Sequence, residues 1–159
     1  MPETAALLTE TPNNADEEKY LIFPIFGRQY AFPAEIIGEV ANCDPMYPLP
    51  LLPSYVLGVI NRYSIPHALL DTGFLLTEAP GPRNEALVIK GDIDHVAFSI
   101  DVVSGIANIG PDKLISLTTG SGPHELTSAI YATFKWNGDD VYVIDVRRIL
   151  ARITDKAGE

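Results

Sequence analysis

The hydrophobic positions of this chain fall into short runs separated by turn residues. They lie at 20–26, 30–32, 56–61, 68–70, 86–89, 95–100 and 129–136. The runs are rich in β-branched, aliphatic and aromatic residues, which is typical of β-strands. Asn137-Gly138 separates the last run from another at 140–144, and an Asn-Gly pair between such runs favours a tight hairpin. The pattern predicts about eight to ten short strands.

Two segments favour short helices. Pro33 stands where a helix would begin, and residues 34–40 can follow it as a short helix or helical turn. Residues 145–153 carry apolar side chains at helical spacing, and Asp145 is placed to cap that helix. Long helices between the strands are missing from the pattern, which argues against a parallel α/β sheet. One or two small barrels is the expected architecture.

Prolines shape two further segments. Pro45, Pro48, Pro50 and Pro53 exclude a helix or a central strand across 44–53. We interpret this segment as a rigid extended connector whose leucines (Leu49, Leu51 and Leu52) make buried contacts. A polyproline ligand for another protein is the alternative. Pro24 indicates an edge position or a bulge in the first strand.

Composition limits the partners and the compartment. The length of 159 residues argues for one compact unit. The net charge of -10 argues against nucleic acid or an anionic membrane surface as partners. Its hydrophobic runs are too short to insert into a membrane. Cys43 has no cysteine to pair with, which favours a cytoplasmic protein. We expect a disordered acidic lead at 1–19, one domain at 20–153 and a flexible tail at 154–159.

One motif suggests catalysis. Two leucines precede Asp71-Thr72-Gly73, as in retropepsin-like aspartic proteases, where paired aspartates activate water. Phe74 follows where those enzymes have a small residue, and an aspartate that ends a strand in a Thr-Gly turn is the structural alternative. The spacing of His67, His95 and His124 converges on no metal. We therefore expect no metal, no cofactor and no enzymatic activity.

The order of the segments resembles the CheW-like family of chemosensory coupling proteins, over roughly 20–153. The resemblance rests on six pieces in register: the opening hairpin, Glu39-Val40, the prolines leading into Val56-Leu-Gly-Val-Ile-Asn61, Asp71 ten residues after Asn61, the segment 100–106, and the closing hairpin with its helix. It implies an all-β fold of two small five-stranded barrels. A short helix would follow the first hairpin, and another would end the chain.

One segment departs from the family pattern. Asn61 is usually followed by Leu-Arg-Gly, but here Arg62, Tyr63 and Ser64 follow. The arginine stands one position early, and in a strand such a shift turns a side chain to the opposite face. In the family this arginine is tied to the binding region for receptors and to adaptor function, so this segment is a candidate for an altered contact.

The resemblance also implies a function. The chain would be a non-enzymatic adaptor that couples the cytoplasmic tips of methyl-accepting receptors to the regulatory domain of a CheA-type histidine kinase, in chemotaxis or type IV pilus motility. The candidate partner-binding residues are Glu39, Val40, Gly58, Val59, Ile60, Asn61, Arg62 and Tyr63. The alternatives are the protease and a stand-alone β-barrel binding module outside chemosensing.

Overall fold

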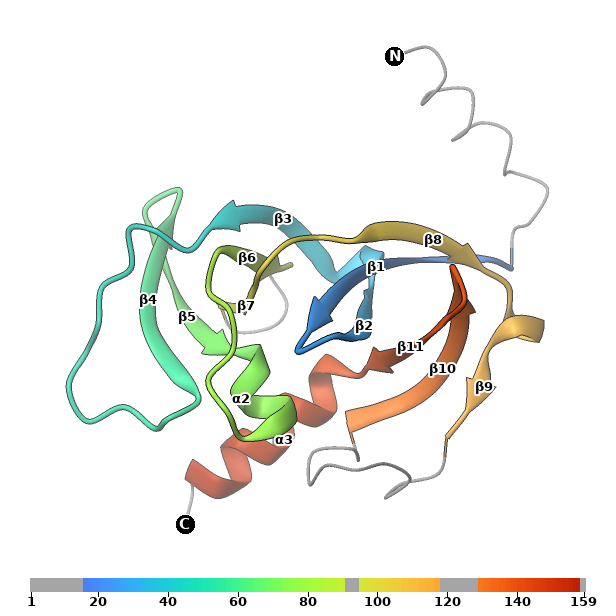
Figure 1. Ribbon diagram of the computed structural model, residues 1–159. Coiled ribbons are helices and arrows are strands. Elements are labelled where there is room, and N and C mark those ends of the chain that lie inside the picture. The colour runs from blue at the N-terminus through green and yellow to red at the C-terminus, as the bar shows by residue number, and fades with distance from the viewer. Residues whose placement is uncertain (1–15, 91–94, 118–128, 158–159) are drawn as a thin grey trace.

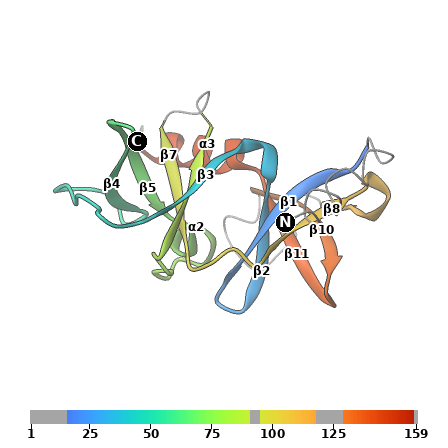
Figure 2. The same ribbon diagram turned by 90° about the horizontal axis from the view of Figure 1, so that it is seen from above.

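The computed structural model describes the backbone of residues 16–90, 95–117 and 129–157, with side chains as far as residue 151. Within these ranges the chain forms eleven strands, two short 3-10 turns and two α-helices. The strands make two sheets that stand side by side and curl into small barrel-like shapes (Figures 1 and 2). The all-β prediction is confirmed.

Sheet A combines the two ends of the described chain. Its strands are β1 (Glu18–Ile25), β2 (Arg28–Pro33), β8 (Gly105–Ile109), β9 (Ile115–Ser116), β10 (Ile130–Trp136) and β11 (Asp139–Ile144). Their order is β8-β1-β2-β11-β10-β9, and only β11 and β2 pair in parallel. The described part of this sheet has six strands rather than the predicted five, because the two-residue β9 adds to its edge.

Sheet B is built from one continuous stretch of chain. Its strands are β3 (Ile37–Asn42), β4 (Val56–Arg62), β5 (Ile65–Asp71), β6 (Glu85–Ile89) and β7 (Val96–Ile100). Their order is β3-β6-β7-β5-β4, with β5 and β7 parallel. The number of strands agrees with the prediction. The connection between β6 and β7 at 91–94 lies outside the described residues.

Strands in both sheets are buried on both faces, which explains their continuous hydrophobic runs. In β1, Tyr20 and Ile22 enter a cluster inside sheet A, whereas Leu21, Phe23 and Ile25 enter a cluster between the sheets. The interior of sheet B holds mainly small side chains: Ala41, Cys43, Ile60, Leu69, Ala86, Val88 and Ala97.

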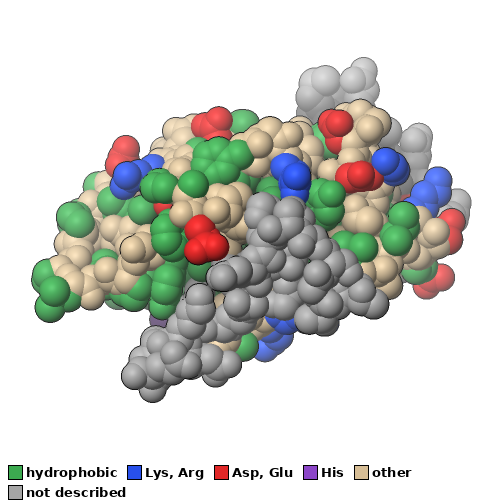
Figure 3. Space-filling view, turned by 60° about the horizontal axis from the view of Figure 1, so that its bottom comes forward, with side chains coloured by type: hydrophobic (Ala, Val, Ile, Leu, Met, Phe, Trp, Pro, Cys, Tyr) green, Lys and Arg blue, Asp and Glu red, His purple; other side chains and the backbone are tan. Residues whose placement is uncertain are grey.

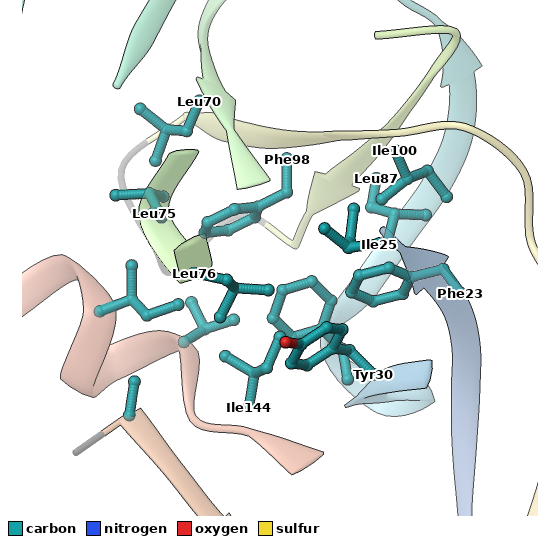
Figure 4. Packing of buried hydrophobic residues seen from close by; sticks show 14 of the residues in the cluster. Phe23, Ile25, Tyr30, Leu70, Leu75, Leu76, Leu87, Phe98, Ile100 and Ile144 are labelled. Atoms are coloured by element: carbon teal, nitrogen blue, oxygen red, sulfur yellow. The ribbon is translucent and has the colours of Figure 1, made fainter. Parts of the chain in front are cut away.

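The cluster between the sheets joins them into one core. Figure 4 shows Phe23 and Tyr30 of sheet A packed towards Phe98 and Ile100 of sheet B, with Leu76 between them. Aromatic rings make the direct contact, since the ring centroids of Phe32 and Phe98 are 5.2 Å apart.

The C-terminal helix α3 (Val146–Ala157) closes this core and extends past the predicted end at Ile153. Val146 and Ile149 are buried in the central cluster. Asp145 caps the helix as predicted, because its Oδ1 accepts hydrogen bonds from the backbone N–H groups of Arg147 and Arg148.

The described hairpins with two-residue turns share one backbone form, and Asn137-Gly138 is the turn that the sequence predicted. Asn137 and Gly138 have φ of 50° and 84°, and Phe26 and Gly27 have φ of 49° and 78°. Such turns need a positive φ at both central residues. In the first hairpin the turn is Phe26-Gly27, and β2 already begins at Arg28.

Of the short helix or helical turn expected at 34–40, a helical turn forms and no longer helix does. Residues Ala34–Ile36 form the 3-10 turn η1, and the chain then continues as β3. Ile37 and Val40 favour a strand through their β-branched side chains, and pairing of β3 with β6 outweighs the weak local helix signal.

Pro24 is not in an edge strand, because β1 lies between β8 and β2. However, the pairing with β8 ends at Ile22, opposite Gly105, so Pro24 is paired on one side only. The missing N–H therefore faces no partner strand.

The proline-rich segment 44–53 contains no strand or helix, as predicted, apart from one isolated bridge between Tyr47 and Val59. The expectation that its leucines are buried is wrong. Leu51 is fully exposed, Leu49 is half exposed and Leu52 is partly buried. The prolines hold the segment away from the core.

Replacing Phe98 by alanine tests the shared core. Phe98 is completely buried between the sheets, so Phe98→Ala should lower the free energy of unfolding by about 3–5 kcal/mol. Urea denaturation followed by circular dichroism measures this loss. Val102→Ala, at an exposed position, is the control and should change the midpoint little. An equal effect of both substitutions would contradict the shared-core arrangement.

Candidate functional site at the end of sheet B

The predicted partner-binding residues lie on the two outer strands of sheet B and the turn that follows. Glu39 and Val40 are in β3, in a strand and not at the exit of a helix as expected. Residues 58–62 belong to β4, and Tyr63 begins the turn to β5. The structure therefore brings together, at one end of sheet B, residues that are far apart in the sequence.

An ion pair connects these outer strands. Arg62 donates two hydrogen bonds to Glu39, from Nε to Oε1 at 2.7 Å and from Nη2 to Oε2 at 3.0 Å. Ala41 and Ile60 point into sheet B, and Glu39 and Arg62 are each two residues from them on the same face. The pair therefore lies over the end of the sheet's interior and joins β3 to β4.

The early position of Arg62 thus has a structural use, since the arginine bonds directly to another candidate residue. Backbone hydrogen bonds also connect the chain around β3 to β4. Tyr47 and Val59 exchange two N–H···O hydrogen bonds of 2.8 and 2.9 Å, so the segment after β3 covers the free edge of β4. Sequence reasoning singled out Glu39 and Arg62 separately, and no local pattern signalled their contact.

The electrostatics favour a charged pair. Hydrogen bonds donated by Arg62 lower the pKa of the Glu39 carboxyl, while partial burial opposes this shift. Attraction to the charges of Arg62 and His67 lowers the pKa further. Both side chains remain partly exposed, at 34% for Arg62 and 25% for Glu39.

Tyr63 is presented at the tip of the β4–β5 hairpin. Its side chain is 83% exposed, and the Arg62 guanidinium lies 5.4 Å from its ring centroid. Tyr63 and Ser64 have φ of 53° and 64°, a region that residues with a Cβ rarely adopt. The tight turn defines the backbone from which the exposed ring projects, and Arg62, which is itself bonded to Glu39, lies beside that ring.

The remaining candidates divide into surface and supporting residues. Val40 and Asn61 are exposed, and Val59 is partly buried. Ile60 is inside sheet B. A side chain at Gly58 would meet the Tyr47 carbonyl oxygen, with only 2.7 Å between that oxygen and the added Cβ. Gly58 and Ile60 therefore position the hairpin.

Hydrophobic side chains gather around this end of the molecule. Figure 3 shows them over the end that sheet B forms, at the left. The exposed ones on β3, β4–β5 and the proline-rich segment are Val40, Tyr47, Leu49, Leu51, Tyr63 and Ile65. Exposed apolar groups that cluster in this way mark interaction surfaces.

A hollow lies at the junction of the two sheets. It has a volume of about 500 Å³ and is lined by Pro33, Glu35, Ile36, Ile89, Lys90, Tyr131, Ile144, Asp145, Val146 and Arg147. The lining includes four charged residues, two acidic and two basic, among apolar ones. Sequence reasoning missed it, because its walls come from η1, β6, β10, β11 and α3.

Asp71 has a structural role. It caps α2 (Thr72–Thr77), a six-residue helix that was not predicted, by accepting from Phe74 N–H at 3.0 Å. Its carboxylate also accepts from Gly81 N–H, at 3.0 and 3.3 Å to its two oxygens. Asp71 is only 2% exposed. A carboxylate occupied in this way does not match the water-activating dyad of an aspartic protease.

Other candidate chemistry is limited in the described part of the chain. No group of three or more His, Cys, Asp or Glu residues there is arranged to hold a metal ion. Burial raises the pKa of the Cys43 thiol to about 11, which leaves it unreactive. No helix within those same ranges is long and apolar enough to cross a membrane.

Comparison with known proteins identifies the fold and the domain. Residues 19–154 match the family model of the CheW-like domain. Among solved structures, the scaffolding protein TtCheW from Thermoanaerobacter tengcongensis is similar, with a TM-score of 0.71 and 14% identity over 82% of this chain and 85% of that chain. A search of curated proteins found no match.

Asp71→Ala should destabilise the protein. The substitution removes the cap of α2 and leaves the N–H of Gly81 unbonded, so we expect a loss of about 2–4 kcal/mol in the free energy of unfolding. Asp71→Asn keeps one acceptor oxygen and should lose clearly less. Urea denaturation distinguishes the two. If Asp71→Ala unfolds at the same urea concentration as the wild type, Asp71 is not a capping residue.

Stability around Glu39 should depend on pH. Because the pKa of Glu39 is lower in the folded state than its ordinary value of 4.5, the ion pair stabilises the fold above pH 4.5 and loses this effect as pH falls through the folded-state pKa. The difference in urea midpoint between wild type and Glu39→Gln should therefore be largest near pH 6 to 7 and shrink towards about pH 3.

Arg62→Gln provides the control for this effect. Once the guanidinium is absent, adding Glu39→Gln should have little further pH-dependent effect. A stability difference that stays constant from neutral to acidic pH would show that the ion pair does not form in solution.

Proposed function

We propose that this chain, which belongs to the CheW-like family, is a non-enzymatic adaptor that connects sensory receptors to a CheA-type histidine kinase. Members of the family are scaffold proteins rather than enzymes, and membership implies an adaptor role in chemotaxis. Its partners would be the receptor and the kinase, and the end of sheet B would be the surface that binds the regulatory domain of the kinase.

The observation that carries this proposal is the fixed presentation of Tyr63. Its ring is 83% exposed, its backbone forms a tight turn, and the paired Arg62 guanidinium lies beside the ring. Exposed aromatic rings that are ordered before binding lose little conformational entropy in a complex. Tyrosine and arginine are also frequent among the residues that dominate binding energy.

The surroundings of Tyr63 suit a protein partner. Val40 and Ile65 add exposed apolar area, and Asn61 can supply directional hydrogen bonds. Val59 lies partly buried beside them, while Gly58 and Ile60 support the hairpin from within. An apolar centre with polar groups at its edge is the usual arrangement of a protein interface.

The second proposed partner is the cytoplasmic tip of a methyl-accepting receptor, docking near the groove between the two sheets. Such a tip is a helical hairpin, and helices commonly bind by placing apolar side chains in a groove. The pathway would be chemotaxis or type IV pilus motility. The altered Asn61-Arg62-Tyr63-Ser64 segment of this chain suits a specialised pathway. We expect the adaptor to act in the cytoplasm.

Calorimetry with the CheW-like regulatory domain of a CheA-type kinase from the same organism tests the proposal. The wild type should bind with a Kd in the micromolar range or tighter. Tyr63→Ala should raise the Kd by at least about tenfold, because it removes the central exposed ring. The melting temperature of the variant confirms that it stays folded.

Phe26→Ala is the matched control. Phe26 is also an exposed aromatic residue at the first position of a two-residue turn with positive φ, but it lies in sheet A. Its removal should leave the Kd nearly unchanged. Equal affinity of Tyr63→Ala and wild type would contradict the proposed surface. Failure of the wild type to bind any such kinase domain would favour a stand-alone binding module.

A further inference from the structure

The hollow at the junction of the two sheets can receive an apolar segment. Pro33, Ile36 and Tyr131 line it and are partly exposed, and the lining also includes the buried Ile144 and Val146. Its volume of about 500 Å³ falls within the roughly 300–1,000 Å³ of natural binding sites. Covering partly exposed apolar groups with further apolar groups removes both from water, which is favourable.

The rim of the hollow favours an occupant with acidic residues. Lys90 and Arg147 line it and are exposed. Of the two acidic lining residues, Asp145 is already engaged, because it caps α3 and its Oδ2 lies 3.5 Å from Nε of Arg148. Glu35 is the other acid, and it is exposed. Two exposed basic side chains therefore face one exposed acid, which favours an occupant with negative charge.

The first described residues of the chain lie beside this hollow. Glu35 lines both the hollow and a neighbouring recess that is formed with residues 17–19. Burial raises the pKa of the Tyr131 hydroxyl, and the nearby Glu18 carboxylate raises it further. Because Tyr131 lines the hollow, this influence also places Glu18 close to it. Residues 1–15 therefore join the described chain next to the hollow.

Residues 1–15, which we call the leading segment, have a sequence that suits this hollow. They contain one apolar run, residues 5–8 (Ala-Ala-Leu-Leu), which lies between Glu3 and Glu10. The leading segment has no basic side chain. Leu8 is eight residues from Asp16, and an extended chain of that length spans at most about 29 Å. The apolar run can thus reach the hollow, with an acidic residue on either side for the basic rim.

We propose that the leading segment folds back and inserts Leu7 and Leu8 into the hollow of its own molecule. The covalent link favours this occupant over a free one, since a short linker holds a segment at an effective concentration on the order of 1 mM. A contact with an intrinsic Kd of about 0.1 mM would then be formed in roughly nine of ten molecules. Glu3 and Glu10 bring negative charge to the rim.

A hollow that is filled in this way is closed to other partners. The receptor tip is proposed to dock near the groove between the sheets, so the leading segment would compete with it. At the occupancy above, competition lowers the apparent affinity for the receptor about tenfold. This consequence rests on the proposed function, whereas occupancy of the hollow is a property of the chain alone.

A spin label on the leading segment tests the contact in the full chain. Thr9→Cys supplies a thiol for a nitroxide, and Cys43 should not react, because it is buried and its pKa is raised to about 11. The label should broaden the amide NMR signals of Ile36 and Val146 in the hollow. The signals of Asn137-Gly138, at the opposite end of β10 and β11, should stay sharp.

Variants on both sides of the contact should release the leading segment. Leu7→Asp/Leu8→Asp removes the apolar side chains and should weaken the contact by about 100-fold or more, so that the broadening in the hollow disappears. The matched control Asn13→Asp/Asn14→Asp adds the same charge to the segment and should leave the broadening unchanged. Arg147→Trp fills the hollow from an exposed helix position and should also remove it. Circular dichroism confirms that each variant folds.

Three results would overturn the occupancy of the hollow. The wild-type signals of the hollow could stay sharp, or their broadening could survive Leu7→Asp/Leu8→Asp. Broadening could also appear when spin-labelled chain is mixed with isotope-labelled chain that has no spin label, which would place the segment on another copy.

Calorimetry with a receptor tip fragment from the same organism tests the competition separately. Leu7→Asp/Leu8→Asp should bind the fragment about tenfold more tightly than the wild type. Equal affinities would show that the receptor docks elsewhere and would overturn the competition. If neither chain binds the fragment, the proposed receptor contact fails, and occupancy of the hollow is decided by the NMR result.

Discussion

Burial of both faces of the strands is the constraint on which this structure depends. A small barrel-like sheet has a narrow interior, so sheet B fills its inside with Ala41, Ala86 and Ala97 together with a few larger aliphatic residues. The outer face of the same strands carries Phe98 and Leu87, which pack against the aromatic residues of sheet A. Each sheet depends on the other for stability, because the large central cluster between them takes residues from both.

The same constraint positions the candidate site. The register of β3 and β4 is set by the residues that they place inside sheet B, because a slip by one residue would turn Ala41 or Ile60 out of its interior. Glu39 and Arg62 meet because Ala41 and Ile60 are held inside the sheet two residues away. The core therefore fixes the strands from whose ends Tyr63 projects, and the ion pair joins those strands at the surface.

Local sequence patterns predicted those parts of the fold that local interactions determine. Asn137-Gly138 specified its hairpin, and Asp145 specified the start of α3, since both act on neighbouring backbone groups. The helix expected after Pro33 became β3 through pairing with β6, which is distant in sequence. The six-residue α2 was missed because one and a half turns are too short for a periodic pattern. Likewise, the contact between Glu39 and Arg62 depends on how the sheet closes.

The order of strands in the chain also bears on synthesis. Sheet B is formed by the continuous stretch 37–100, whereas sheet A needs β1 and β2 from the beginning of the chain and β10 and β11 from its end. As the chain leaves the ribosome, sheet B can assemble while the first hairpin still lacks the strand that pairs with β2. The apolar face of that hairpin must wait until β11 emerges, and a nascent chain is most exposed to aggregation and chaperone binding during this interval.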